Sequence, residues 1–194
     1  MLKVYFSIVL LGLCTASGVQ AHEATGVAGG FASGFMHPIL GWDHVAAMVA
    51  VGLWGAFLGK PAIWLLPVVF PLVMAAGGVL GVAGISLPGV ETGIAVSAIV
   101  LGAMILFALK PPLWIAALIV GAFAIFHGHA HGTELPDAVS PLAYSLGFVL
   151  STGLLHVGGI AFGLLVHWPA GRVAVRTAGA LIAGAGLGFL SGAL

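Results

Sequence analysis

The sequence has very little charge. Only 5% of its 194 residues are charged, with 5 basic and 5 acidic side chains and a formal net charge of zero. Soluble domains carry roughly 25% charged residues, so a globular protein with a water-facing surface is excluded. The chain also has neither a basic patch nor an acidic tail, which excludes nucleic acid as a partner.

The sequence also has almost no cysteine, because Cys14 is the single thiol in the chain. One cysteine allows neither an intrachain disulfide nor a cysteine-based metal site. Any metal ligands must therefore come from the 8 histidines, the carboxylates and the 5 methionines.

Apolar residues and glycine are abundant instead. Apolar residues make up 61% of the chain, which also has 31 glycines and a mean hydropathy of +1.25. The surface must therefore face lipid.

At the amino terminus, Lys3 precedes an apolar run over 4–13, and a run of small residues ends at Ala21. This run is too short to span a bilayer, so we predict a secretory signal peptide over 1–21 that is cleaved after Ala21. The alternative is an uncleaved anchor helix.

Six apolar segments follow the predicted cleavage site, at about 38–59, 61–84, 90–109, 111–128, 140–166 and 173–193. Most approach the ~20 residues that cross a hydrocarbon layer of ~30 Å. We therefore predict an all-α fold, a polytopic membrane helix bundle with six transmembrane helices in a single domain over 22–194. Glycine and proline mark the breaks, and Ser140-Pro141 is a favourable start for the fifth helix. Residues 24–36 are too short to span and could be re-entrant or lie flat on the outer face.

The basic residues beyond the signal peptide lie in the connections after spans one, three and five. They are Lys60, Lys110, Arg172 and Arg176. The positive-inside rule places these connections in the cytoplasm. We therefore predict a bacterial inner-membrane protein with both ends of the mature chain on the periplasmic side. All the acidic residues then lie at or near the outer face.

Four pairs of glycines are spaced four residues apart, which predicts close helix packing. These pairs are Gly77/Gly81, Gly159/Gly163, Gly184/Gly188 and Gly188/Gly192.

The densest polar cluster runs from His37 to His44 and is followed by Met48. If one helix runs from Pro38, then His37, His44 and Met48 share a face, with Asp43 beside them. Imidazole, thioether and carboxylate ligands suit Ni²⁺ or Co²⁺ better than Mg²⁺ or Ca²⁺. The alternative is a structural Asp43–His44 pair, but an ionisable pair within a membrane segment favours a functional role.

A second cluster alternates histidine with small residues, at His127, His129 and His131. Short histidine-rich tracts bind metals, so we predict a flexible chelating strip in an external loop. The alternative is a solvated polar loop. His22, at the predicted new amino terminus, would combine a free amine with an imidazole, unless it belongs to a disordered terminus.

Two further ionisable residues occur in the predicted spans. Glu91 lies in the first turn of span three, where a carboxylate either stabilises the helix dipole or supplies a ligand from a second helix. His156 lies in the longest span and needs a polar partner in lipid. We expect it to line a pathway, the alternative being a hydrogen-bonded core histidine.

The run from His37 to Trp54 resembles the signature of the HupE/UreJ family of membrane proteins, H-P-x-x-G-x-D-H-x-x-x-M-x-x-V-G. The matching residues are His37, Pro38, Gly41, Asp43, His44, Met48, Val51 and Gly52. The resemblance continues at Glu91, Phe126-His127-Gly128, Ala130-His131-Gly132 and Leu155-His156. It implies a nickel or cobalt permease that supplies hydrogenase or urease maturation, with metal ligands between His37 and His44.

The favoured hypothesis is therefore a non-enzymatic permease or facilitator that carries Ni²⁺ or Co²⁺ inward as substrate, with no prosthetic group. In this hypothesis His127, His129 and His131, with His22, collect the ion. His37, Asp43, His44 and Glu91 then replace part of its water shell, and Met48 and His156 offer weaker inner sites. A cytoplasmic metallochaperone could receive the ion.

Two other functions fit the same residues. An intramembrane zinc-dependent hydrolase could use these histidines and an assisting serine such as Ser33, Ser97 or Ser151. A haem-binding electron carrier could use His44 and His156 as axial ligands.

Overall fold

The computed structural model describes residues 26–135 and 140–193, and these residues form seven α-helices, one short 3-10 helix and no strand. In chain order they are α2 (Gly26–Leu40), α3 (Trp42–Leu58), α4 (Ala62–Val82), α5 (Val90–Leu106), α6 (Leu113–Thr133), α7 (Pro141–Gly163), η1 (Leu164–His167) and α8 (Pro169–Ser191). The predicted all-α fold is confirmed. The predicted signal peptide and His22 lie outside the described residues.

Several helices are suited to cross a bilayer. By length and composition, α4, α6, α7 with its 3-10 extension, and α8 each qualify alone. The bent pair α2–α3 qualifies as a unit, and α5 is a shorter apolar helix. Large apolar side chains such as Trp64, Leu118 and Leu181 are exposed on the outside, as lipid contact requires. The chain is therefore a multi-pass membrane protein. The prediction of six crossings requires that α5 and the bent pair count as one crossing each.

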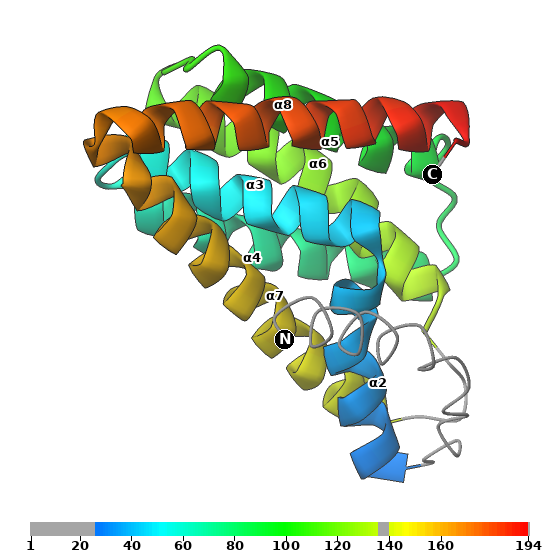
Figure 1. Ribbon diagram of the computed structural model, residues 1–194. Helices are drawn as coiled ribbons and strands as arrows, with labels where there is room; N and C mark the ends of the chain where they lie inside the picture. The colour runs from blue at the N-terminus through cyan, green and yellow to red at the C-terminus, as the bar shows by residue number, and fades with distance from the viewer. Residues whose placement is uncertain (1–25, 136–139, 194) are drawn as a thin grey trace, which may run out of the picture.

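The helices pack in pairs around a buried α3. The main contacts join α4 with α6, α5 with α8, and α7 with both α2 and α3 (Figure 1). Almost every residue of α3 from Ala47 to Ala56 is buried. Figure 1 shows α8 lying along one edge of the bundle and α2 extending from the opposite side, beside the start of α7.

Two of the predicted glycine pairs allow this close packing. A Cβ atom on Gly77 or Gly81 would overlap the backbone of α6, and one on Gly159 or Gly163 would overlap α3. The prediction for these pairs is confirmed. It is wrong for Gly184, where a Cβ would meet nothing within 4 Å, because α8 meets α5 through other glycines.

Several predicted helix ends can now be compared with the structure. The predicted cap at Ser140 is confirmed, since its Oγ accepts a hydrogen bond from the Ala143 amide at 3.4 Å. By contrast, α6 continues to Thr133 instead of ending near residue 128, and α8 begins at Pro169 instead of residue 173. The extra turn of α6 packs against α4, and proline at the first position favours a helix start.

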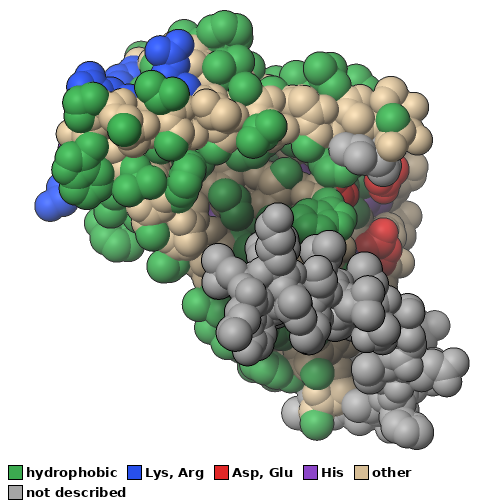
Figure 2. Space-filling view, viewed as in Figure 1, with side chains coloured by type: hydrophobic (Ala, Val, Ile, Leu, Met, Phe, Trp, Pro, Cys, Tyr) green, Lys and Arg blue, Asp and Glu red, His purple; other side chains and the backbone are tan. Residues whose placement is uncertain are grey.

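Charged side chains gather at opposite ends of the molecule. Figure 2 shows Lys and Arg at one end of the visible face and Asp and Glu at the other. At the basic end, the Arg176 Nε donates to the Leu106 carbonyl oxygen at 2.7 Å, and the Lys110 ammonium lies 4.9 Å from the centre of the Phe57 ring. The basic groups are thus held at the ends of the helices, where loops leave the bundle.

Candidate metal-binding site

The signature run is bent. α2 ends at Leu40, α3 begins at Trp42, and the two helices meet at 79° with Gly41 between them. The prediction of one continuous helix carrying a ladder of ligands is therefore wrong. The bend instead places His37, near the end of α2, opposite His44, in the first turn of α3. Their ring centres are 5.8 Å apart.

Asp43 binds its own neighbour. One carboxylate oxygen, Oδ1, accepts hydrogen bonds from the His44 backbone amide at 2.8 Å and from the His44 Nδ1 at 2.6 Å. Gly41 leaves room for this arrangement, because a Cβ at that position would lie 2.9 Å from the His44 Nδ1. The Nδ1 therefore carries the proton, and the lone pair is on Nε2. Metal-binding histidines are commonly oriented by a carboxylate in this way.

Three imidazoles converge near this pair. His37, His44 and His131 each offer one nitrogen, and these three atoms lie within 4.8 Å of one another. The ring of His131 is centred 4.5 Å from that of His44 and 4.8 Å from that of His37. The three ligands come from α2, α3 and α6.

Several nitrogens of this cluster are buried and have no hydrogen-bond partner among the described residues. They are the His44 Nε2 and both ring nitrogens of His131. An unpartnered polar group is costly in an apolar interior, and a bound cation would remove that cost. Imidazole donors suit Ni²⁺, Co²⁺ and Zn²⁺ rather than Mg²⁺ or Ca²⁺.

His127 lies beside the cluster, with its ring centre 5.3 Å from that of His44. A serine fixes its tautomer. The Ser97 hydroxyl donates to the Ile94 carbonyl at 2.6 Å, so it must accept from the His127 Nε2 at 3.0 Å. The proton is therefore on Nε2, and the buried, unpartnered Nδ1 holds the lone pair. His127 is thus a fourth available imidazole.

The second histidine cluster is helical, and the prediction of a flexible strip is wrong. His127 and His131 are one turn apart on α6, so they share a face. His129 lies on a different face, where its Nε2 donates to the Ile85 carbonyl at 2.7 Å. All three histidines are buried. The structure therefore brings two of them to the cluster and leaves the third at the interface with α4.

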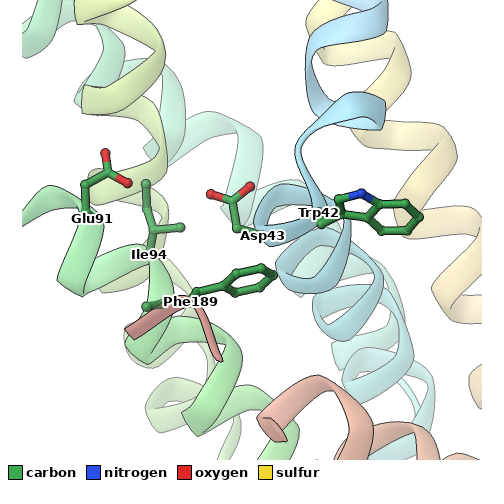
Figure 3. Close-up of a pocket in the computed structure, with 6 residues that line it drawn as sticks. Trp42, Asp43, Glu91, Ile94 and Phe189 are labelled. Carbon is green, nitrogen blue, oxygen red and sulfur yellow. The ribbon is translucent and has the colours of Figure 1, made fainter. Parts of the chain in front are cut away.

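Two of the acidic residues line one cleft. Asp43 and Glu91 line a cleft of about 300 Å³ together with Trp42 and Ile94. Figure 3 shows the two carboxylates on opposite sides of this cleft. Glu91 is therefore placed at the cleft and not among the imidazoles. Glu134 lies on another side of the cluster, with its Oε2 3.5 Å from the His37 Nε2.

The remaining predicted ligands lie deeper. Met48 is fully buried in the apolar core of the bundle. His156, on α7, is 2% exposed, and within 26–135 and 140–193 its Nε2 has no hydrogen-bond partner. Its ring is centred 5.5 Å from that of Phe70. The structure thus separates His156 from the three-histidine cluster.

Sequence reasoning missed the contributions of Ser97, Phe70 and Glu134 to this region. The sequence connects Ser97 only with a hydrolase. Its position is a signal for a role near the histidines, because Ser97 is a polar residue in an otherwise apolar stretch of α5 and such residues need a partner in lipid. No comparable signal marks Phe70 among the many apolar residues of α4.

The fold and the cluster together define a multi-pass membrane protein with a buried polyhistidine site. The family model described as HupE / UreJ protein matches residues 8–189. Protein HupE of Rhizobium leguminosarum bv. viciae is 47% identical over 173 residues, which cover 89% of this chain and 91% of that protein. The chain therefore belongs to the HupE/UreJ family, which confirms the resemblance seen in the sequence. No solved structure gives a significant match.

Proposed function

We propose that this protein is a permease or facilitator that carries a divalent transition metal ion, Ni²⁺ or Co²⁺, into the cell for the maturation of enzymes such as hydrogenase or urease. The single observation that carries the proposal is the convergence of His37, His44 and His131 within 4.8 Å of one another. These side chains come from three helices and lie beside a fourth buried imidazole, that of His127. Family membership supports the same function.

In this proposal the ion enters through the acidic cleft. Asp43 and Glu91 attract the hydrated cation, and the imidazoles of His44, His131 and His37 then replace part of its water shell. Neutral imidazole ligands hold the ion less firmly than a set of thiolates would. Transport benefits from this moderate affinity, because an ion that binds too tightly does not leave. His127 and then His156 would offer the next positions.

The proposed orientation follows from the separation of charge (Figure 2). Residues 1–21 are a cleaved signal peptide, and residues 22–194 form one domain of six transmembrane helices in the inner membrane. The basic end faces the cytoplasm, where a metallochaperone could collect the ion, and both ends of the mature chain are periplasmic. His22 would then lie on the side of the acidic cleft and could contribute to capture.

Transport into proteoliposomes tests the proposal. Uptake of radiolabelled nickel and cobalt is compared between the wild type and the Asp43→Asn, His44→Ala and His131→Ala variants. His167→Ala is the matched control, because His167 lies in η1 outside the cluster. We expect each of the three site variants to lose most of the uptake and the control to keep it. Wild-type uptake by folded site variants would refute the proposal.

A second candidate function is an intramembrane zinc-dependent hydrolase, and one observation favours it. An apolar groove of about 520 Å³ between α4, α6 and α7 has His131 in its wall, next to Tyr144 and Phe148. A lipid chain in this groove would approach the histidine cluster. Chelator-sensitive cleavage of a lipid amide or ester by the purified protein, without metal uptake, would favour this function over transport. The haem-binding alternative has no comparable support.

A further inference from the structure

The Phe70 ring contacts two imidazoles that come from different helices. Its centre is 5.6 Å from the centre of the His127 ring and 5.5 Å from that of the His156 ring. The planes of Phe70 and His156 are perpendicular. The Phe70 side chain is fully buried. An ion that moves from His127 to His156 therefore meets this ring.

α7 carries a second set of buried polar atoms. Among the residues that the structure describes, the His156 Nε2, the Thr152 Oγ1 and the Ser151 Oγ have no hydrogen-bond partner. Thr152 and His156 are one turn apart, so their side chains are neighbours on the helix surface. Three unpartnered groups on one segment of a membrane helix carry an energetic cost that a partly hydrated cation would relieve.

The backbone of α4 is weakened at Phe70. Pro67 and Pro71 lie within the helix on either side of it. Proline has no amide hydrogen, so the carbonyl groups of Ile63 and Pro67 lose their usual helical partners. Bends and rearrangements of helices concentrate at such positions. The turn that carries Phe70 can therefore move with the loss of fewer backbone hydrogen bonds than an interior turn without proline.

We propose that Phe70 is a gate between the outer histidine cluster and an inner metal-binding position at His156. The gate is closed in this structure. Its apolar ring offers no ligand to a hydrated divalent ion and excludes water, as hydrophobic constrictions do in channels. The ion passes when the proline-flanked turn carries the ring aside. This inference rests on the proposed transport function.

Cysteine labelling tests the gate without depending on transport. In a Cys14→Ser background, His156→Cys places a thiol at the α7 position whose side chain contacts the Phe70 ring. A positively charged, membrane-impermeant thiol reagent is then added to proteoliposomes. We expect slow labelling with the native Phe70 and labelling at least about tenfold faster in the Phe70→Ala variant, which corresponds to a barrier lower by ~1.4 kcal/mol. Ser145→Cys, on an exposed surface of α7, is the control and should label at the same rate in both backgrounds.

Metal uptake provides the second measurement. Phe70→Ala should raise the rate of nickel uptake about tenfold and should also admit Mg²⁺. The affinity of the outer cluster for nickel should change less than about twofold, since Phe70 supplies no ligand. Phe70→Leu keeps much of the apolar bulk and replaces Phe70→Ala if the alanine variant does not fold. Phe70→Leu should raise the rate of nickel uptake by less than Phe70→Ala does.

Equal labelling of His156→Cys with Phe70 present or truncated would overturn the gate. The same conclusion follows if uptake and ion selectivity are unchanged by truncation. If the wild type neither binds nor carries nickel, the proposed function fails, and the labelling rates alone then decide whether Phe70 closes the path.

Discussion

The role of Asp43 gives the sharpest test of the site. In the structure its Oδ1 accepts hydrogen bonds from the His44 amide and the His44 Nδ1 at 2.8 and 2.6 Å. Asp43→Asn keeps the shape but removes the negative charge that orients the imidazole and increases its basicity. Loss of such a supporting group weakens metal binding about 10- to 100-fold, which corresponds to ~1.4–2.8 kcal/mol of binding free energy. We expect nickel affinity to fall within this range.

A double-mutant cycle separates this role from direct ligation. Nickel binding to purified protein is measured by isothermal titration calorimetry for Asp43→Asn, His44→Ala and the double variant, with His167→Ala as control. If Asp43 acts through His44, adding Asp43→Asn to His44→Ala weakens binding by less than about threefold, because interacting residues are not additive. The same loss in both backgrounds would refute this reasoning and indicate an independent ligand. Unchanged affinity of Asp43→Asn would refute it as well.

Three further predictions follow from the structure. Ser97→Ala removes the acceptor that fixes the His127 tautomer, so nickel affinity should fall about three- to tenfold, whereas Ser97→Thr should retain the wild-type affinity. Isothermal titration calorimetry measures these affinities, and a wild-type affinity in Ser97→Ala would contradict this role of Ser97. Gly128→Val places side-chain atoms against the backbone of α4, so this variant should fail to give a monodisperse peak in size-exclusion chromatography. Gly153→Ala is the control and should elute as the wild type does, because a Cβ at Gly153 meets nothing within 4 Å. Lys60→Cys and Ser145→Cys, in a Cys14→Ser background, should react with impermeant thiol reagents from opposite sides of the membrane; labelling from the same side would contradict the proposed orientation.

Much of the fold could be predicted because lipid imposes a simple rule. Every backbone polar group within the bilayer needs an internal partner, so long apolar segments must be helical. Local signals then placed some boundaries well, as at Ser140, where a hydroxyl cap precedes proline. The boundary of α6 could not be placed in this way. Its last turn is rich in glycine and histidine, which suggests a loop, but contact with α4 keeps it helical.

The residues of the histidine cluster could be predicted in part, but not their arrangement. The motif from His37 to His44 contains two of the three histidines, and periodicity alone favours one straight helix. The bend at Gly41 leaves room for the contact between Asp43 and His44, and periodicity does not indicate it. Likewise, the alternation of His127, His129 and His131 suggests three equivalent ligands. Only the helical rotation of 100° per residue, together with the position of α4, separates His129 from the others.

The origin of the ligands also bears on how the protein is made. His37 and His44 belong to the first segments to leave the ribosome, whereas His131 is synthesised almost ninety residues later, on α6. A nascent chain that has inserted only its early helices therefore lacks the third imidazole of the cluster. Under the proposed function, metal capture follows the docking of α6 against α4.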